Sequence, residues 1–232
     1  MNYDWQAGLV LLLLVVGLSK LGKYLAFKVP DLAAERQKNK EVDRDKLKTE
    51  KYPPVVKATQ KVGLYSNLLF FFGYAPFFIS LAPQPWWRAP LDIFLILMIY
   101  DFFYYLMHRF LFHGQGYFRK VHALHHQARS PTYIDAHYVH PLETFMGLNL
   151  FLLLIPALSI ALGGLHAVHV AIAYVIYVQI NQVNHCLVEL PYSPFKTLSW
   201  ITAKHAVHHE NMHKGNYATI TLLYDKLFGT LD

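Results

Sequence analysis

The chain has 232 residues, of which 54% are hydrophobic and 16% charged, and its formal net charge is +6. It is too apolar for a typical soluble domain, in which about a quarter of residues are charged, and also for a disordered chain. One cysteine, Cys186, excludes an intramolecular disulfide framework. Because 12 of the 21 Lys and Arg lie between Lys20 and Lys61 among acidic residues, without a nucleic-acid-binding motif, we expect no nucleic-acid partner.

Apolar segments follow one another along the chain, and each is a possible membrane helix. They are residues 5–27, 63–82, 90–107, 144–162 and 166–183. A helix crosses about 30 Å of hydrocarbon with about 20 mostly apolar residues. Residues 5–27 become amphipathic at Lys20 and Lys23, so this segment either crosses or lies as a buried or interfacial helix. The sequence therefore predicts an all-α integral membrane protein with four to five transmembrane helices.

The distribution of basic residues predicts the orientation. If all five segments cross and the N-terminus is outside, residues 20–61, 108–141 and 184–232 lie on one side and hold 12, 4 and 4 of the 21 Lys and Arg. Arg88 alone lies on the other side. Because loops rich in Lys and Arg stay in the cytoplasm, we expect a cytoplasmic-side helical cap made from these three stretches.

Two parts of the chain differ in composition. Residues 1–62 are expected to form an N-terminal apolar helix and a charged cytoplasmic connector, and residues 63–232 a membrane-embedded catalytic domain. Within the connector, residues 31–61 carry 15 charged side chains, which predicts a solvated helix or loop beside the membrane.

All 14 histidines follow residue 107, and most of them fall in short motifs. Side chains three and four residues apart share a helix face, so each His-x2-His-His motif can present several imidazoles together. Imidazole binds zinc, copper, iron and nickel. Eight imidazoles are too many for one ion and suit two; the alternative is a set of interfacial histidines without metal. The eight are His108, His113, His122, His125, His126, His205, His208 and His209.

These motifs resemble the fatty acid hydroxylase and sterol desaturase superfamily, histidine-rich di-iron oxygenases of membranes, over roughly residues 97–230. The matching elements are Asp101, Tyr105, His108, Arg109 and His113 in the spacing Asp-x3-Tyr-x2-His-Arg-x3-His, the two His-x2-His-His boxes, and the closing run NYATITLLYDKLFGT. Ala218 stands where the family has Gly, and Tyr224 where it has Trp. The segment HHQARSPTYIDAHYVHPLE resembles the sterol-oxidising branch.

The resemblance implies a set of metal ligands. Besides the eight histidines it includes His185, in NQVNHCLVELP, and the further candidate His213, whereas His140 and His137 are weaker candidates. Carboxylates are expected to orient ligand imidazoles, although a helix cap or a surface role is as compatible with each. They are Asp101, Glu143, Glu189, Glu210 and Asp225.

The resemblance also implies an activity: two Fe ions and O2 oxidise a C–H bond of a sterol-like or fatty-acyl lipid by hydroxylation or desaturation. The chain shows no flavin or haem segment, so an external electron donor is expected, a reductase with a cytochrome b5-like protein or a ferredoxin. The active site would face the cytoplasm, at the endoplasmic reticulum in a eukaryote or the inner membrane in a bacterium.

The alternative is a metal-free or zinc-binding membrane protein without oxygenase activity, acting as a scaffold or a transporter. A transporter places its ligands near mid-bilayer and often has repeated halves, and neither is visible here. A zinc hydrolase needs a motif such as His-Glu-x2-His, which His209-Glu210 does not complete.

Overall fold

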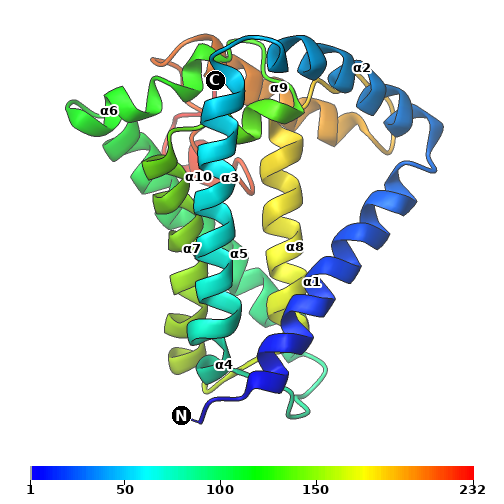
Figure 1. The fold of residues 1–232 in the computed structure, drawn as a ribbon, viewed down its shortest axis with the longest axis vertical. Coiled ribbons are helices and arrows are strands. Elements are labelled where there is room, and N and C mark those ends of the chain that lie inside the picture. The colour runs from blue at the N-terminus through cyan, green and yellow to red at the C-terminus, as the bar shows by residue number, and fades with distance from the viewer. Residues whose placement is uncertain (1) are drawn as a thin grey trace.

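Long helices run side by side in the computed structural model, which describes residues 2–232 (Figure 1). They are α1 (Trp5–Ala26), α3 (Tyr52–Leu68), α5 (Arg88–Leu106), α7 (Pro141–Leu162) and α8 (Ala167–Asn184). Two of them continue as π-helices, α3 into η1 (Leu69–Tyr74) and α5 into η2 (Met107–Phe112). The predicted all-helical class is confirmed, because the described strands are two residues each.

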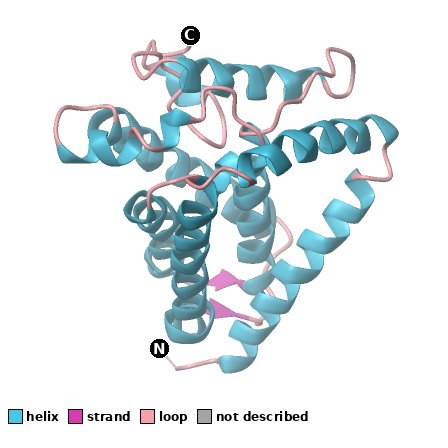
Figure 2. Cartoon of the chain, turned by 45° about the horizontal axis from the view of Figure 1, so that its top comes forward, coloured by secondary structure: helices cyan, strands magenta, loops and turns pink. Residues whose placement is uncertain are grey.

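Further helices lie across the end of the bundle where the C-terminus is found (Figure 1). They are α2 (Pro30–Leu47), α6 (Tyr117–His122), η3 (His125–Gln127), η4 (Tyr133–His137), α9 (Lys196–Glu210) and α10 (Leu223–Leu227). At the opposite end, α4 (Ala75–Phe78) leads into β1 (Ile79–Ser80), which pairs in parallel with β2 (Leu165–His166), as Figure 2 shows. The histidine-rich segments therefore belong to one end of the molecule.

Among the described residues, three helices have the length and apolar character needed to cross a membrane. They are Trp5–Ala26, Arg88–Phe112 and Pro141–Leu162. The expected segment 63–82 is instead divided among α3, η1 and α4, and α8 matches the segment 166–183 but ends in polar residues. The count of four to five spans stays a prediction.

Helix α1 joins the hydrophobic core of the bundle through one face. Ala7, Leu11 and Val15 are buried at four-residue spacing, and they pack in one cluster with residues of η1 and α8 such as Phe71 and Val170. Asp4 caps the helix, because its Oδ1 accepts a hydrogen bond from the Ala7 amide at 2.9 Å. The division of the chain at residue 62 stays a prediction, and this core extends across it.

Helix α2 differs from the expected solvated connector. It is a helix, but Glu35, Asn39 and Asp43 form a buried stripe at four-residue spacing along one face. The expectation of full solvation is wrong for this face, because its polar groups make hydrogen bonds to loops of the end layer. A run of charged residues does not reveal which of its members find such partners.

Gly8 lies at a close approach between α1 and the chain that follows α3. A Cβ at this position would lie 2.8 Å from the Phe71 carbonyl oxygen and 2.8 Å from Pro76 Cγ, whereas a Cβ at Gly17 would meet nothing within 4 Å. We expect Gly8→Ala to lower the free energy of unfolding by about 1–3 kcal/mol through overpacking. Gly17→Ala is the matched control and should gain up to about 1 kcal/mol from helix propensity. Thermal unfolding in detergent micelles measures both, and equal melting temperatures would contradict the close approach.

Candidate metal centre

Nine histidines gather in two clusters at the layered end of the bundle. Within each cluster, one ligand nitrogen from every residue lies within 4.8 Å of the others. The five-histidine cluster consists of His108, His113, His122, His126 and His208, and the four-histidine cluster consists of His125, His185, His205 and His209. All nine positions were expected from the sequence.

Each His-x2-His-His box contributes to both clusters. On α9, His205 and His209 stand one turn apart and enter the four-histidine cluster, while His208 points to the other. The first box divides in the same way, with its outer pair His122 and His126 in the five-histidine cluster, although α6 ends at His122 and the chain then tightens into η3. His125 and His126 are adjacent there and point to different clusters. The clusters therefore share both boxes.

The Nδ1 atoms of most cluster histidines are held by oxygen atoms that can only accept hydrogen bonds. In the five-histidine cluster, Nδ1 donates to a carbonyl or carboxylate oxygen at 2.7–2.8 Å, in the pairs His108–Tyr217, His113–Met212, His208–Gly215 and His122–Glu143. In the other cluster, the pairs are His125–Tyr138 at 3.1 Å and His185–Asn181 at 2.8 Å. Because Nδ1 carries the hydrogen in a neutral ring with such a partner, Nε2 presents a lone pair.

These Nε2 atoms face one another at short range. In the five-histidine cluster the Nε2 atoms lie 2.9–3.2 Å apart in the pairs His108–His122, His113–His122, His122–His126 and His108–His208. In the four-histidine cluster they lie 3.0–3.2 Å apart in the pairs His125–His185, His185–His205 and His205–His209. Facing lone pairs repel unless a cation lies between them. With metal–nitrogen bonds of about 2.1 Å, ligand nitrogens lie about 3.0 Å apart at right angles and about 3.4 Å apart in a tetrahedron. The donor sets therefore fit metal ions, with spacing nearer the right-angled arrangement.

Burial lowers the pKa of several of these rings. Loss of solvent lowers the pKa of His113 to about 4 and takes the pKa values of His208 and His209 well below the ordinary value, and neighbouring imidazoles lower them further. The side chain of His208 has no exposed surface. Neutral imidazoles are the form that binds metals, so protons compete weakly for this site at neutral pH.

The carboxylates expected near the site differ in what they contact. Glu143, in the first turn of α7, accepts from His122. Asp225 accepts from the amides of Tyr217 and Ala218 at 2.8 Å, and thereby holds the carbonyl that receives His108 Nδ1–H. Asp225 therefore influences the ligand His108 through the backbone of Tyr217 rather than by bonding to an imidazole ring.

Asp101, on α5, supports the C-terminal segment that also contains Tyr217 and Ala218. Its side chain is fully buried and accepts from the amides of Thr219, Ile220 and Thr221 at 2.8–3.0 Å. Glu189 instead has a side chain that is 67% exposed, 3.9 Å from Lys38. Glu210 is exposed at the end of α9. The structure does not bring these last two to the clusters.

Several histidines lie outside both clusters. His213 is exposed, three residues beyond the end of α9. His140 and His166 cap α7 and α8, since each Nδ1 accepts from a backbone amide two residues later. His169 donates to the buried Asp92 at 2.8 Å near the opposite end of the bundle, and His137 lies in η4.

The carbonyl oxygens that orient the ligand rings were not predicted from the sequence. They belong to Tyr217, Met212, Gly215, Tyr138 and Asn181. Every residue has a carbonyl group, so no residue type marks such a position. Three of these residues lie in segments that resemble the family or flank His185, but nothing in those segments distinguishes their carbonyl groups.

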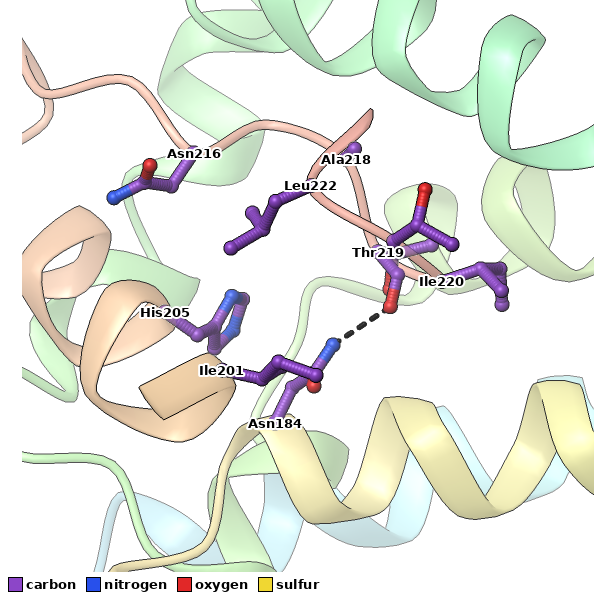
Figure 3. Close-up of a pocket in the computed structure, with 9 residues that line it drawn as sticks. Asn184, Ile201, His205, Asn216, Ala218, Thr219, Ile220 and Leu222 are labelled. Carbon is purple, nitrogen blue, oxygen red and sulfur yellow. Dashed lines mark hydrogen bonds between the residues drawn. The ribbon is translucent and has the colours of Figure 1, made fainter. Parts of the chain in front are cut away.

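A cavity borders both clusters on the side of α5 and α8. Its walls include Tyr104, His108, His125, Asn181 and Thr219. A second pocket shares His205, Ala218 and Thr219 with it and continues between the end of α8, α9 and residues 216–222 (Figure 3).

The walls of this second pocket combine apolar side chains, among them Ile201, Ile220 and Leu222, with polar ones. Figure 3 shows Asn184 on one side, where its Nδ2 donates to the Thr219 carbonyl at 2.7 Å. The two pockets therefore lie next to each other beside the imidazoles.

Comparison with known proteins agrees with this centre. Residues 93–230 match the family model described as fatty acid hydroxylase. The chain belongs to the fatty acid hydroxylase family. This confirms the family expected from the histidine boxes, and the matched region contains all nine cluster histidines.

Relatives of the chain include sterol-oxidising enzymes. It is 30% identical over 158 residues to methylsterol monooxygenase 1 of Rattus norvegicus, covering 64% of this chain and 51% of that protein. It is also 30% identical over 153 residues to methylsterol monooxygenase 2-2 of Arabidopsis thaliana, covering 64% and 55%. A very-long-chain aldehyde decarbonylase of Arabidopsis thaliana is 29% identical over 185 residues, covering 73% and 28%.

The chain thus spans about half or less of the length of these curated relatives. No solved structure matches it. The helices able to span a membrane, together with these relatives, support an integral membrane protein of the sterol desaturase and hydroxylase type.

Glu143 allows a test of how ring orientation affects metal binding. Glu143→Leu removes the acceptor for His122 Nδ1–H, and we expect metal affinity to fall by about 10–100-fold. Glu143→Gln keeps an acceptor oxygen and should retain more of the affinity. Metal titration against a competing chelator measures both variants, and equal affinities for Leu and wild type would contradict the role of this contact.

The depressed pKa values predict how pH affects the metal-free protein. In the unfolded chain a histidine has a pKa of about 6.5, whereas burial lowers the pKa of folded His113 to about 4. The unfolded state therefore binds more protons between these two pH values. Stability is therefore complete above about pH 6.5 and falls as the pH drops toward about 4. Melting temperatures of metal-free protein should therefore fall as the pH is lowered through this range. A melting temperature that rises on acidification would contradict the prediction.

Proposed function

We propose that the chain binds two iron ions, one in each cluster, and uses O2 to hydroxylate or desaturate a C–H bond of a sterol-like or fatty-acyl lipid. The observation that carries the proposal is the convergence of Nε2 lone pairs at 2.9–3.2 Å in both clusters. Nine neutral donors without a carboxylate among them suit a transition metal.

The alternatives account less well for these contacts. A structural zinc site takes four ligands in a tetrahedron, whereas one cluster offers five nitrogens at closer spacing. A transporter site is expected near mid-membrane, whereas these clusters lie where α5, α8 and α9 end. A scaffold without metal leaves the repulsion between lone pairs uncompensated.

The residues of this chain hold the ions and shape the space beside them. When bound, the iron ions would activate O2, which is the oxidant for an unactivated C–H bond, with electrons from the external donor. The nine Nε2 atoms serve as ligands, and the contacts to Glu143 and the Tyr217 carbonyl keep His122 and His108 in their orientations. Nine ligands would leave about three of roughly twelve positions on two six-coordinate ions open for O2.

In this proposal the lipid reaches the centre through the two pockets beside it. Ile201, Ile220 and Leu222 line the second pocket, and Tyr104 borders the cavity beside His108. These apolar side chains help exclude water from the reacting carbon and fit a substrate that leaves the bilayer. Two relatives are named methylsterol monooxygenases, which favours a sterol-like substrate.

The centre faces the cytoplasm in this proposal, since 20 of the 21 basic residues fall on that side if the five apolar segments cross. An external reductase with a cytochrome b5-like protein or a ferredoxin supplies the electrons. The membrane is that of the endoplasmic reticulum in a eukaryote or the inner membrane in a bacterium.

Metal analysis of the purified chain tests the two-iron assignment. We expect about two irons per chain in the wild type and about one in His208→Ala and in His125→Ala, because each removes a ligand from a different cluster. His213→Ala is the matched control and should keep both. A single zinc in the wild type, or two irons retained in both ligand variants, would contradict the assignment of one iron to each cluster.

Lipid profiling tests the reaction. Cells that express the wild type should accumulate a lipid with an added hydroxyl group or double bond, and cells that express His208→Ala should not. The product should require O2 and disappear when cells are kept anaerobic. Identical lipid profiles for wild type and His208→Ala under air would contradict the activity.

A further inference from the structure

We infer that α2 holds the four-histidine cluster in place and that Asn39 and Asp43 are its positioning residues. The inference rests on the proposed function, because it concerns the second of the two metal sites. The buried stripe of α2 makes polar contacts with two loops. One loop follows His185, and the other follows η3 and leads to Tyr138, whose carbonyl accepts from His125; both histidines belong to this cluster. Neither residue touches an imidazole, so each acts through the backbone between.

Asn39 pairs with both backbone groups of one residue, Leu187, just after His185. Its Nδ2 donates to the Leu187 carbonyl at 2.7 Å, and its Oδ1 accepts from the Leu187 amide at 2.9 Å. The Asn39 side chain is buried, whereas the Leu187 side chain is 43% exposed. The two-point contact fixes the position and the rotation of the Leu187 backbone, and it binds the chain to α2 two residues beyond His185.

Glu35 adds a contact on the same loop. Its Oε2 accepts from the Glu189 amide at 3.3 Å, one turn of α2 from Asn39. The Asn39 Nδ2 also donates to the Glu35 carbonyl at 2.9 Å, which sets the direction of its amide group. The loop from Cys186 to Leu190 thus lies along the polar stripe.

Asp43 holds the loop that follows His126. Its Oδ1 accepts from Thr132 Oγ1 at 2.7 Å and from the Ile134 amide at 3.2 Å. Lys46, on the same face, donates to the Ser130 carbonyl at 3.0 Å and forms an ion pair with Asp135.

This loop leads directly to a ligand contact. Asp135 also accepts from the Tyr52 hydroxyl at 2.8 Å, and the Tyr52 ring stacks on Tyr138 with centroids 4.0 Å apart. The Tyr138 carbonyl receives the Nδ1–H of His125. The position of His125 therefore depends on the loop that Asp43 fixes.

The five-histidine cluster has a different support. Its Nδ1 partners are Glu143 on α7 and the carbonyls of Met212, Gly215 and Tyr217 near the C-terminus. Asp225 holds that C-terminal segment, and α2 provides none of these contacts. Loss of the α2 contacts should therefore affect one metal site and spare the other.

The test measures iron content and iron environment in full-length protein in micelles. Asn39→Ala and Asp43→Ala should each lower iron from about two to about one per chain, and the Mössbauer spectrum should lose one of two iron signals. Asp43→Asn keeps an acceptor for Thr132 and Ile134 and should restore the second iron. Lys40→Ala, on the exposed side of α2, is the matched control and should bind two.

The outcomes separate this inference from the proposed function. Fewer than two irons in the wild type refutes the proposed function itself. Two irons in the wild type and in both alanine variants overturns the inference. Loss of both irons together, in a chain with a lower melting temperature, also overturns it, because α2 would then only stabilise the whole fold.

Discussion

The repulsion between converging imidazole lone pairs is the constraint on which the rest of this structure depends. The nine cluster rings either donate Nδ1–H to an oxygen acceptor or lie in buried surroundings. Their Nε2 atoms point at one another within about van der Waals distance. Such an arrangement costs free energy in a metal-free chain, and a cation in each cluster offsets that cost. The surrounding contacts must therefore hold rings that would otherwise separate.

Two polar scaffolds meet this demand. Asp101 and Asp225 bind the backbone between Tyr217 and Thr221, which carries the acceptor for His108. The stripe of α2 binds the loops beyond His126 and His185. Both scaffolds use buried carboxylates or amides that bind peptide groups, and such contacts are costly to leave unmade. The rings are thus fixed by backbone geometry more than by packing.

The apolar helices provide the frame. Helix α8 lies between α1 and α5 and ends at the centre, with Asn181 and Asn184 in its last turns beside the cavities. Its polar residues reduce its apolar character, which is why it falls outside the helices that qualify as membrane spans by composition. A helix that is surrounded by protein can carry such groups because it has partners for them.

The sequence by itself determined the helical class, the family and the residues that form the centre, because apolar runs and histidine spacing are properties of residue type. Tertiary structure alone decided which histidines share a cluster. His213 follows His209 by four residues, but α9 ends at Glu210 and the extended backbone of Asn211 takes His213 away. It also decided the role of α2, whose Asn39 and Asp43 look like solvated residues in a charged run. Hydrogen bonds to backbone groups of distant loops leave no trace in residue type, so they appear only when the chain is folded.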